Sequence, residues 1–72
     1  MNRELTETLL AMEGVDGTKI INKDEVKVFF KDKAIHLALV NEAARLLSCY
    51  GYSSTAIGYD PIANKVILKA QP

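Results

Sequence analysis

The sequence predicts an α+β domain in which helices and strands follow one another as α-β-β-α-β-β. A length of 72 residues allows one domain, here residues 1–72. Two segments show the 3.6-residue hydrophobic period of a helix, and four short segments rich in β-branched residues are bounded by turn residues. Because an isolated hairpin is barely stable, we expect one four-stranded, largely antiparallel sheet with two helices packed on one face.

The first helix is expected at Asn2–Glu13, and its first residue can serve as the cap. Leu5, Leu9 and Met12 recur at the spacing of one helical face, and Gly14 is a suitable stop.

The four strands are expected at residues 18–21, 26–30, 55–59 and 65–70. Asp16-Gly17 is expected to form a turn, and residues 22–25 and 60–64 are expected to reverse the chain within the two hairpins. The run of Val, Ile and Leu in the last strand favours a central position in the sheet.

A second, longer helix is expected at residues 33–50, capped by Asp32 and stopped at Gly51. Its polar face is narrow, and its apolar arc spans roughly 200°, although a stripe of about 100° is enough to cover a sheet. Two explanations remain open. Either the first helix and the sheet cover this arc from two directions, or part of it is a subunit interface.

The second explanation defines a candidate partner interface on this helix and the third strand, formed by Leu37, Val40, Ala44, Leu47, Ile57 and Tyr59. The size of the chain favours such a partner, since a domain this small buries only about 60% of the surface that its unfolded chain exposes. A single cysteine also rules out an intramolecular disulfide as a staple.

The composition bounds the kind of partner. Nine Lys and Arg balance nine Asp and Glu, so the chain lacks the excess positive charge that nucleic-acid binding needs. No segment reaches the ~20 apolar residues of a membrane span, and the start does not read as a signal peptide. With one cysteine, we expect a cytoplasmic protein whose partners are itself, as a homodimer, and another protein, with no nucleic acid and no membrane.

No catalytic, cofactor-binding or metal-binding residue is predicted. His36 lies within the apolar arc near the helix start, so we expect it at the edge of the core. Cys49 is thirteen residues further on, about 20 Å along a helix, so the two can neither share a metal ion nor act as nucleophile and base. Three tyrosines are expected to pack against the core, with an aromatic binding patch as the alternative: Tyr50, Tyr52 and Tyr59.

Residues 9–25, LLAMEGVDGTKIINKDE, resemble the opening of Roadblock/LC7 domains, in which a helix ends in a similar glycine turn and leads into a hairpin. A long helix and another hairpin follow in both. This chain is shorter, lacks the final strand and helix of typical members, and has Asp24-Glu25 where a glycine is common. The resemblance implies a homodimer with the long helices side by side and the Ser54–Tyr59 strands paired across the two-fold axis.

These observations favour a small non-catalytic protein–protein interaction module, homodimeric and Roadblock-like, that acts as a scaffold or as a regulator of a small GTPase or motor. The alternative is a small inhibitor or accessory protein of phage or plasmid type that binds one host protein as a monomer. A third hypothesis is an enzyme that uses His36 or the tyrosines.

Overall fold

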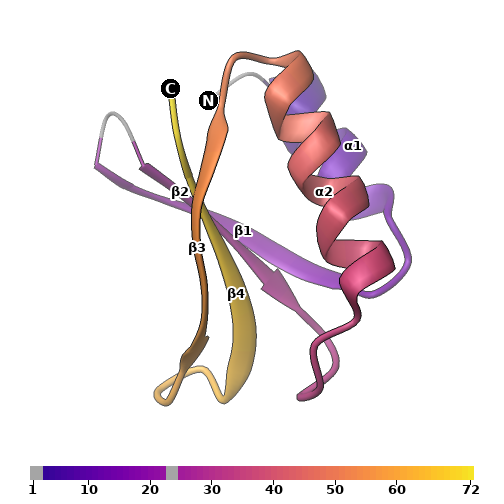
Figure 1. Ribbon diagram of the computed structural model, residues 1–72, viewed down its shortest axis with the longest axis vertical. Coiled ribbons are helices and arrows are strands. Elements are labelled where there is room, and N and C mark those ends of the chain that lie inside the picture. The colour runs from indigo at the N-terminus through magenta and orange to yellow at the C-terminus, as the bar shows by residue number, and fades with distance from the viewer. Residues whose placement is uncertain (1–2, 23–24) are drawn as a thin grey trace.

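The computed structural model describes residues 3–22 and 25–72, with the side chains of residues 20–22 outside the description. Two helices and four strands follow one another in the predicted order α-β-β-α-β-β, which confirms the fold class (Figure 1). They are α1 (Arg3–Ala11), β1 (Val15–Asn22), β2 (Glu25–Phe30), α2 (Leu37–Cys49), β3 (Ser53–Asp60) and β4 (Lys65–Gln71). The predicted cap at Asn2 and the residues Lys23 and Asp24 of the first reversal lie outside the described residues.

The four strands form one antiparallel sheet in the order β1-β2-β4-β3. The predicted central position of β4 is confirmed, and β1 and β3 are the two edges. Both helices cover the same face of the sheet and lie beside each other, α1 over β1 and α2 over β3 and β4 (Figure 1). Neither helix of the described residues lies on the opposite face, which we call the open face.

The core lies between the helices and the sheet. Val26, Val28 and Phe30 alternate with less buried residues along β2, because successive side chains of a strand point to opposite faces. The buried cluster also draws on the other elements, with Leu5, Leu9, Val15, Val40, Ala43, Leu47, Val66, Leu68 and Ala70. The residues between these on β2 and β4 therefore belong to the open face.

The start of α2 differs from the prediction, because this helix begins at Leu37 and Asp32 is not its cap. One carboxylate oxygen of Asp32 accepts the Ala34 amide at 3.3 Å, and the other lies 2.7 Å from His36 Nε2. Such local bonds offer the backbone an alternative to the helix. They hold Asp32 to His36 in a turn, and the cap position falls on His36, with φ −102° and ψ 100°.

The end of α2 is as predicted. Gly51 has a φ of 85°, in the region that favours glycine. Its N–H donates to the Ser48 carbonyl at 3.1 Å, and the Tyr52 N–H donates to the Leu47 carbonyl at 2.9 Å. This pair of bonds is the Schellman motif, which satisfies carbonyls that the helix end leaves free.

The link from α1 to β1 also differs from the prediction. The helix ends at Ala11, and Asp16-Gly17 forms part of β1 at a shift in register. The reversal lies earlier, at Gly14, whose φ is 94° and whose carbonyl accepts the Lys31 amide at 2.8 Å. Since Gly14 already turns the chain, the expected turn at Asp16-Gly17 is not needed.

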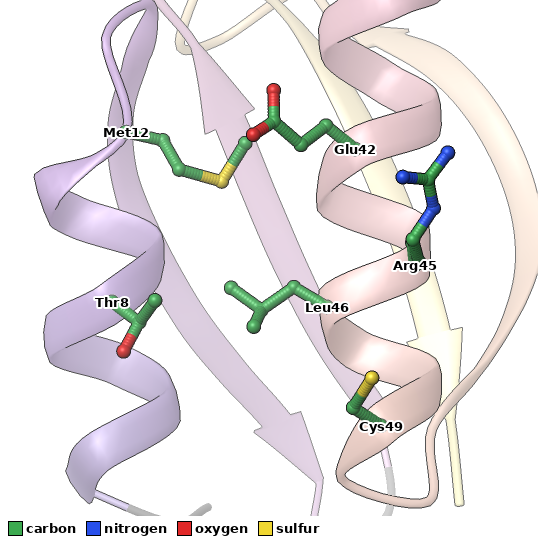
Figure 2. Close-up of a pocket in the computed structure, with 6 residues that line it drawn as sticks. All are labelled: Thr8, Met12, Glu42, Arg45, Leu46 and Cys49. Carbon is green, nitrogen blue, oxygen red and sulfur yellow. The ribbon is translucent and has the colours of Figure 1, made fainter.

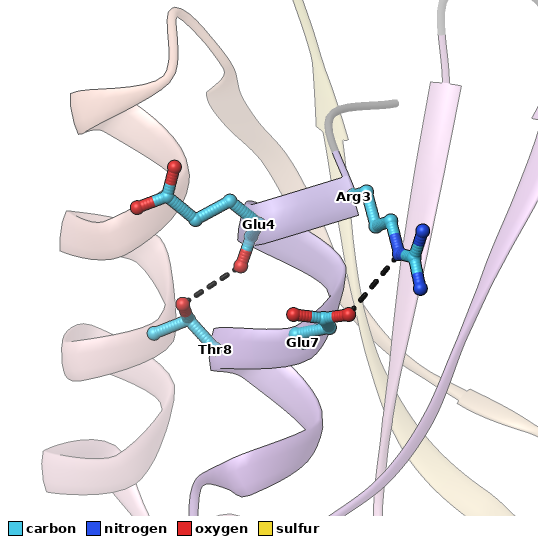
Figure 3. Close-up of polar contacts among 4 residues, drawn as sticks. All are labelled: Arg3, Glu4, Glu7 and Thr8. Atoms are coloured by element: carbon cyan, nitrogen blue, oxygen red, sulfur yellow. Dashed lines mark hydrogen bonds and ion pairs between the residues drawn. The ribbon is translucent and has the colours of Figure 1, made fainter.

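The exposed side of α1 is held by local polar contacts (Figure 3). Arg3 Nε lies 3.2 Å from a Glu7 carboxylate oxygen, and the Thr8 hydroxyl donates to the Glu4 carbonyl at 2.7 Å. Burial, together with the negative charge of Glu4, raises the pKa of Tyr50 at the end of α2. The start of α1 and the end of α2 therefore also interact through the polar groups of Glu4 and Tyr50.

Candidate functional site

The edge strand β3 is the most exposed element of the sheet. In the described part of the chain it pairs with β4 alone, so its outer backbone groups have no strand beside them. All of its residues except Asp60 are exposed, and Ser53–Tyr59 contains no charged residue. Free edges of this kind are templates for pairing with another strand.

The opposite edge, β1, is built differently. Its register with β2 shifts near both ends, between Val15 and Gly17 and between Ile20 and Asn22. It also carries Asp16 and Lys19, charged residues of the kind that discourage strand pairing. β3 has one such shift, between Ser54 and Ala56, but no charged residue from Ser53 to Tyr59. Only β1 therefore combines shifts near both ends with charged side chains.

A shallow apolar groove lies beside the free edge, between α2 and β3. We call it the α2–β3 groove. It has a volume of about 310 Å³ and is lined by Val40, Asn41, Ala44, Ser54, Thr55, Ala56, Ile57 and Leu68. An extended segment added to β3 would run along this groove, with every second side chain on the groove side of the joined sheet.

The structure divides the predicted interface residues into two groups. Leu37, Ile57 and Tyr59 are 66%, 45% and 49% exposed, and Ala44 is half-buried in the groove. Val40 and Leu47 are 3% and 0% exposed. These two belong to the core of the single chain and offer little surface to a partner, although Val40 also lines the groove.

The wide apolar arc of α2 is covered from two directions, by the sheet beneath it and by α1 beside it (Figure 1). This accounts for the buried Val40, Ala43 and Leu47. At the start of the helix the cover ends, and Ile35 and Leu37 are 54% and 66% exposed. Cover by α1 and the sheet therefore accounts for most of the apolar arc. Only the start of α2 and the α2–β3 groove are left as surface for a subunit interface.

A second groove, of about 270 Å³, lies between the two helices (Figure 2). Leu46 points from α2 towards α1, and Met12 points from the end of α1 towards Glu42. Cys49 lies at the last residue of α2 and is exposed, whereas the single histidine lies before the first turn of the same helix. The groove therefore contains a thiol without a histidine that could activate it.

His36 is not at the edge of the core, contrary to the prediction. More than half of its side chain is exposed, and it contacts Asp32. The pKa of Asp32 is lowered, first by this hydrogen bond and then by the bond from Ala34. The helical wheel placed His36 on the apolar arc because it assumed a helix from Lys33.

The three tyrosines do not form one patch. Tyr50 and Tyr52 pack partly buried against the core, as predicted, at the end of α2 and just beyond it. Tyr59 is exposed near the far end of β3.

In residues 3–22 and 25–72, no three His, Cys, Asp or Glu residues gather into a possible metal site. Neither helix in this part of the chain is long and apolar enough to cross a membrane.

The polar half of the groove was not predicted from the sequence. Asn41 falls on the polar face of the wheel, and Ser54 and Thr55 precede the apolar part of β3. The absence of charge from Ser53 to Tyr59, visible in the sequence, was the signal that could have marked the edge strand.

The fold and this edge define the class of the molecule as a small α+β domain with one exposed sheet edge that is uncharged from Ser53 to Tyr59. Comparison with protein-family models, with curated proteins and with solved structures gave no match. The resemblance to Roadblock/LC7 domains therefore stays a prediction.

Proposed function

We propose that this protein is a non-catalytic protein–protein interaction module that works as a homodimer joined along β3. The observation that carries the proposal is the exposed and uncharged β3 edge beside the apolar α2–β3 groove. A second copy satisfies the free backbone groups of the edge with its own β3, in the manner of strand addition.

The two-fold axis of such a dimer is perpendicular to the sheet, because two identical strands then pair antiparallel with the same faces aligned. The joined sheet has eight strands, and both α2 helices lie on one side of it. Ile57 and Tyr59 both lie on the helix-covered face, since they pair with the core residues Val66 and Leu68. In the dimer they meet their counterparts above the joined strands.

Charge and size favour a second copy as the occupant. Self-pairing of Ser53–Tyr59 places no like charges opposite each other, which would be destabilising. A 72-residue domain without a disulfide gains from a partner subunit. The arrangement is also the one that the Roadblock/LC7 resemblance implies. A scaffolding or regulatory role, another protein as second partner and a cytoplasmic location remain parts of the proposal.

Sedimentation equilibrium at tens of micromolar tests the proposal with one variant and one matched control. Ile57→Lys places a charge on the proposed interface, whereas Leu10→Lys makes the same kind of change at a residue of α1 that is 48% exposed. We expect wild type and Leu10→Lys to be dimers and Ile57→Lys to be a folded monomer, because a buried unpaired charge is costly.

A wild-type monomer over this concentration range would contradict the proposal. If that monomer co-purified with one host protein at fixed stoichiometry, the alternative function as an inhibitor or accessory protein would replace it. Dissociation of both variants would show that the interface is not at β3.

A further inference from the structure

The open face of the sheet carries three lysines in one row. Lys19 of β1 pairs directly with Lys27 of β2, which pairs directly with Lys69 of β4. Directly paired residues of antiparallel strands share a face. Because Val26, Val28 and Leu68 point into the core, the lysines next to them lie on the open face. We call these three residues the lysine row.

The lysine row takes part in no close ion pair in the described part of the chain, although the charges of Lys19 and Lys27 act on the Asp60 carboxylate. A fourth lysine of the same face, Lys65, lies 3.2 Å from Asp16, but no ion pair among residues 3–22 and 25–72 includes the three lysines of the row. Like charges directly opposite each other on neighbouring strands destabilise a sheet. Such a local conflict is expected where a surface serves binding.

An apolar row lies next to the lysine row. Phe29 pairs directly with Ile67, and the same line of residues continues to Gly17 on one side and Gly58 on the other. A Cβ at either glycine would meet nothing within 4 Å, so both ends of the row are open. Ile67 is only 4% exposed although no helix covers it, so it is the side chains around it that shield it. Phe29 is half-buried and remains available for contact.

We propose that the open face binds an extended acidic segment of another protein, with its carboxylates on the lysine row and an apolar side chain against Phe29. The three strands span about 10 Å, which is the length of about three residues of extended chain. The proposal gives the chemistry of the second partner of the interaction module and does not depend on pairing of β3.

The acidic groups of the same face favour a polypeptide over a nucleic acid. Glu25 pairs with the position of Asn22 and accepts a hydrogen bond from Gln71 at 3.2 Å, and Asp60 pairs with Lys65. These carboxylates leave the face with little excess positive charge. Nucleic-acid binding relies on neutralising several phosphates, whereas a short acidic peptide needs only a few contacts.

Fluorescence anisotropy tests this with a labelled peptide of four glutamates around one leucine, in low salt. The test variant is Lys27→Gln/Lys69→Gln, and Lys33→Gln changes an exposed lysine outside the sheet. We expect the double variant to weaken binding about tenfold and Lys33→Gln to leave it within about twofold, because exposed ion pairs contribute modestly but add up. The double variant should melt close to wild type, because the lost repulsion within the row offsets the lost attraction between Lys27 and Asp60.

Equal weakening by Lys33→Gln, or no binding of the peptide up to millimolar concentration, would overturn the proposal. So would preference for an oligothymidylate of the same charge, which would point to a nucleic acid. A peptide with glutamine in place of glutamate should not bind. The monomeric variant Ile57→Lys should bind the acidic peptide as wild type does, so failure of the dimer and failure of this site are distinguished.

Discussion

Ile57 of β3 is paired directly with Leu68 of β4 on the helix-covered face of the sheet, yet 45% of Ile57 is exposed against 1% of Leu68. Burial therefore falls sharply from β4, which lies in the core, to the neighbouring edge strand β3. The difference arises because Leu68 has strands on both sides, while the outer side of β3 has none in the described chain. This step in burial is the basis of the proposed interface.

A similar difference in burial on α2, between Val40 and Leu37, predicts different losses of stability for two aspartate substitutions. Val40→Asp should destabilise the folded chain by about 3–5 kcal/mol, because Val40 is buried and the new carboxylate has no partner there. Leu37→Asp should change the free energy of unfolding by no more than about 0.5 kcal/mol in the monomeric Ile57→Lys background, because Leu37 is 66% exposed. Urea unfolding followed by circular dichroism measures both.

A large loss of stability in Leu37→Asp would mean that the start of α2 is packed in the folded chain. A small loss in Val40→Asp would contradict the core described above.

Substitution of Gly14, after the end of α1, should lower the stability of the fold more than substitution of Gly17 within β1. A Cβ on Gly14 would lie 2.6 Å from Leu39 Cδ2, and the φ of 94° is one that other residues rarely adopt. Gly14→Ala should therefore cost about 1–2 kcal/mol, with the displacement of Leu39 added. Gly17→Ala, at ordinary φ and with nothing near its Cβ, is the control and should change stability by less than about 0.5 kcal/mol.

Thermal unfolding of the two variants checks this comparison. If both lowered the melting temperature equally, the close approach of Gly14 and Leu39 would not be a feature of the folded protein.

Sequence patterns predicted the order of the elements, because hydrophobic periods of 3.6 and 2 depend only on neighbouring residues. The start of α2 was not predictable in this way, since the bond between Asp32 and His36 competes with the helix. The burial of Val40 and Leu47, against the exposure of Leu37, depends on which side of α2 faces the sheet. Periodicity alone does not give that orientation.

The two hairpins and the central position of β4 were predicted, but the register between the strands was out of reach of local patterns. The lysine row exists only because the register places Lys19, Lys27 and Lys69 opposite one another, although they are far apart in the sequence. A net charge of zero gave no sign of this local concentration.

Acidification should reveal the contribution of the turn at Asp60. Its pKa is below the ordinary value of 3.8, mainly because the Ala63 amide donates to its carboxylate, with the Ile62 amide and the charges of Lys27 and Lys19 acting in the same direction. The folded state thus binds fewer protons than the unfolded state, so this contribution is fully present above pH 3.8 and is lost as the pH falls through the lower folded-state pKa.

Asp60→Asn isolates this effect, because it keeps an acceptor for the two amides and removes the charge. We expect the wild type to melt above Asp60→Asn at neutral pH, and we expect the gap to close below about pH 3. A gap that stayed constant across this range would show that the charge of Asp60 is not the cause.

Disulfide trapping along β3 tests the central claim most directly. In a Cys49→Ser background, single cysteines are placed in turn at residues 54 to 58, with Leu10→Cys as an equally exposed control on α1. In a dimer paired through β3, the position at the two-fold axis faces its own copy at a separation that a disulfide can bridge. We expect one position within β3 to form covalent dimers at least about tenfold faster than Leu10→Cys. Cross-linking no faster at any β3 position than at the control would contradict it.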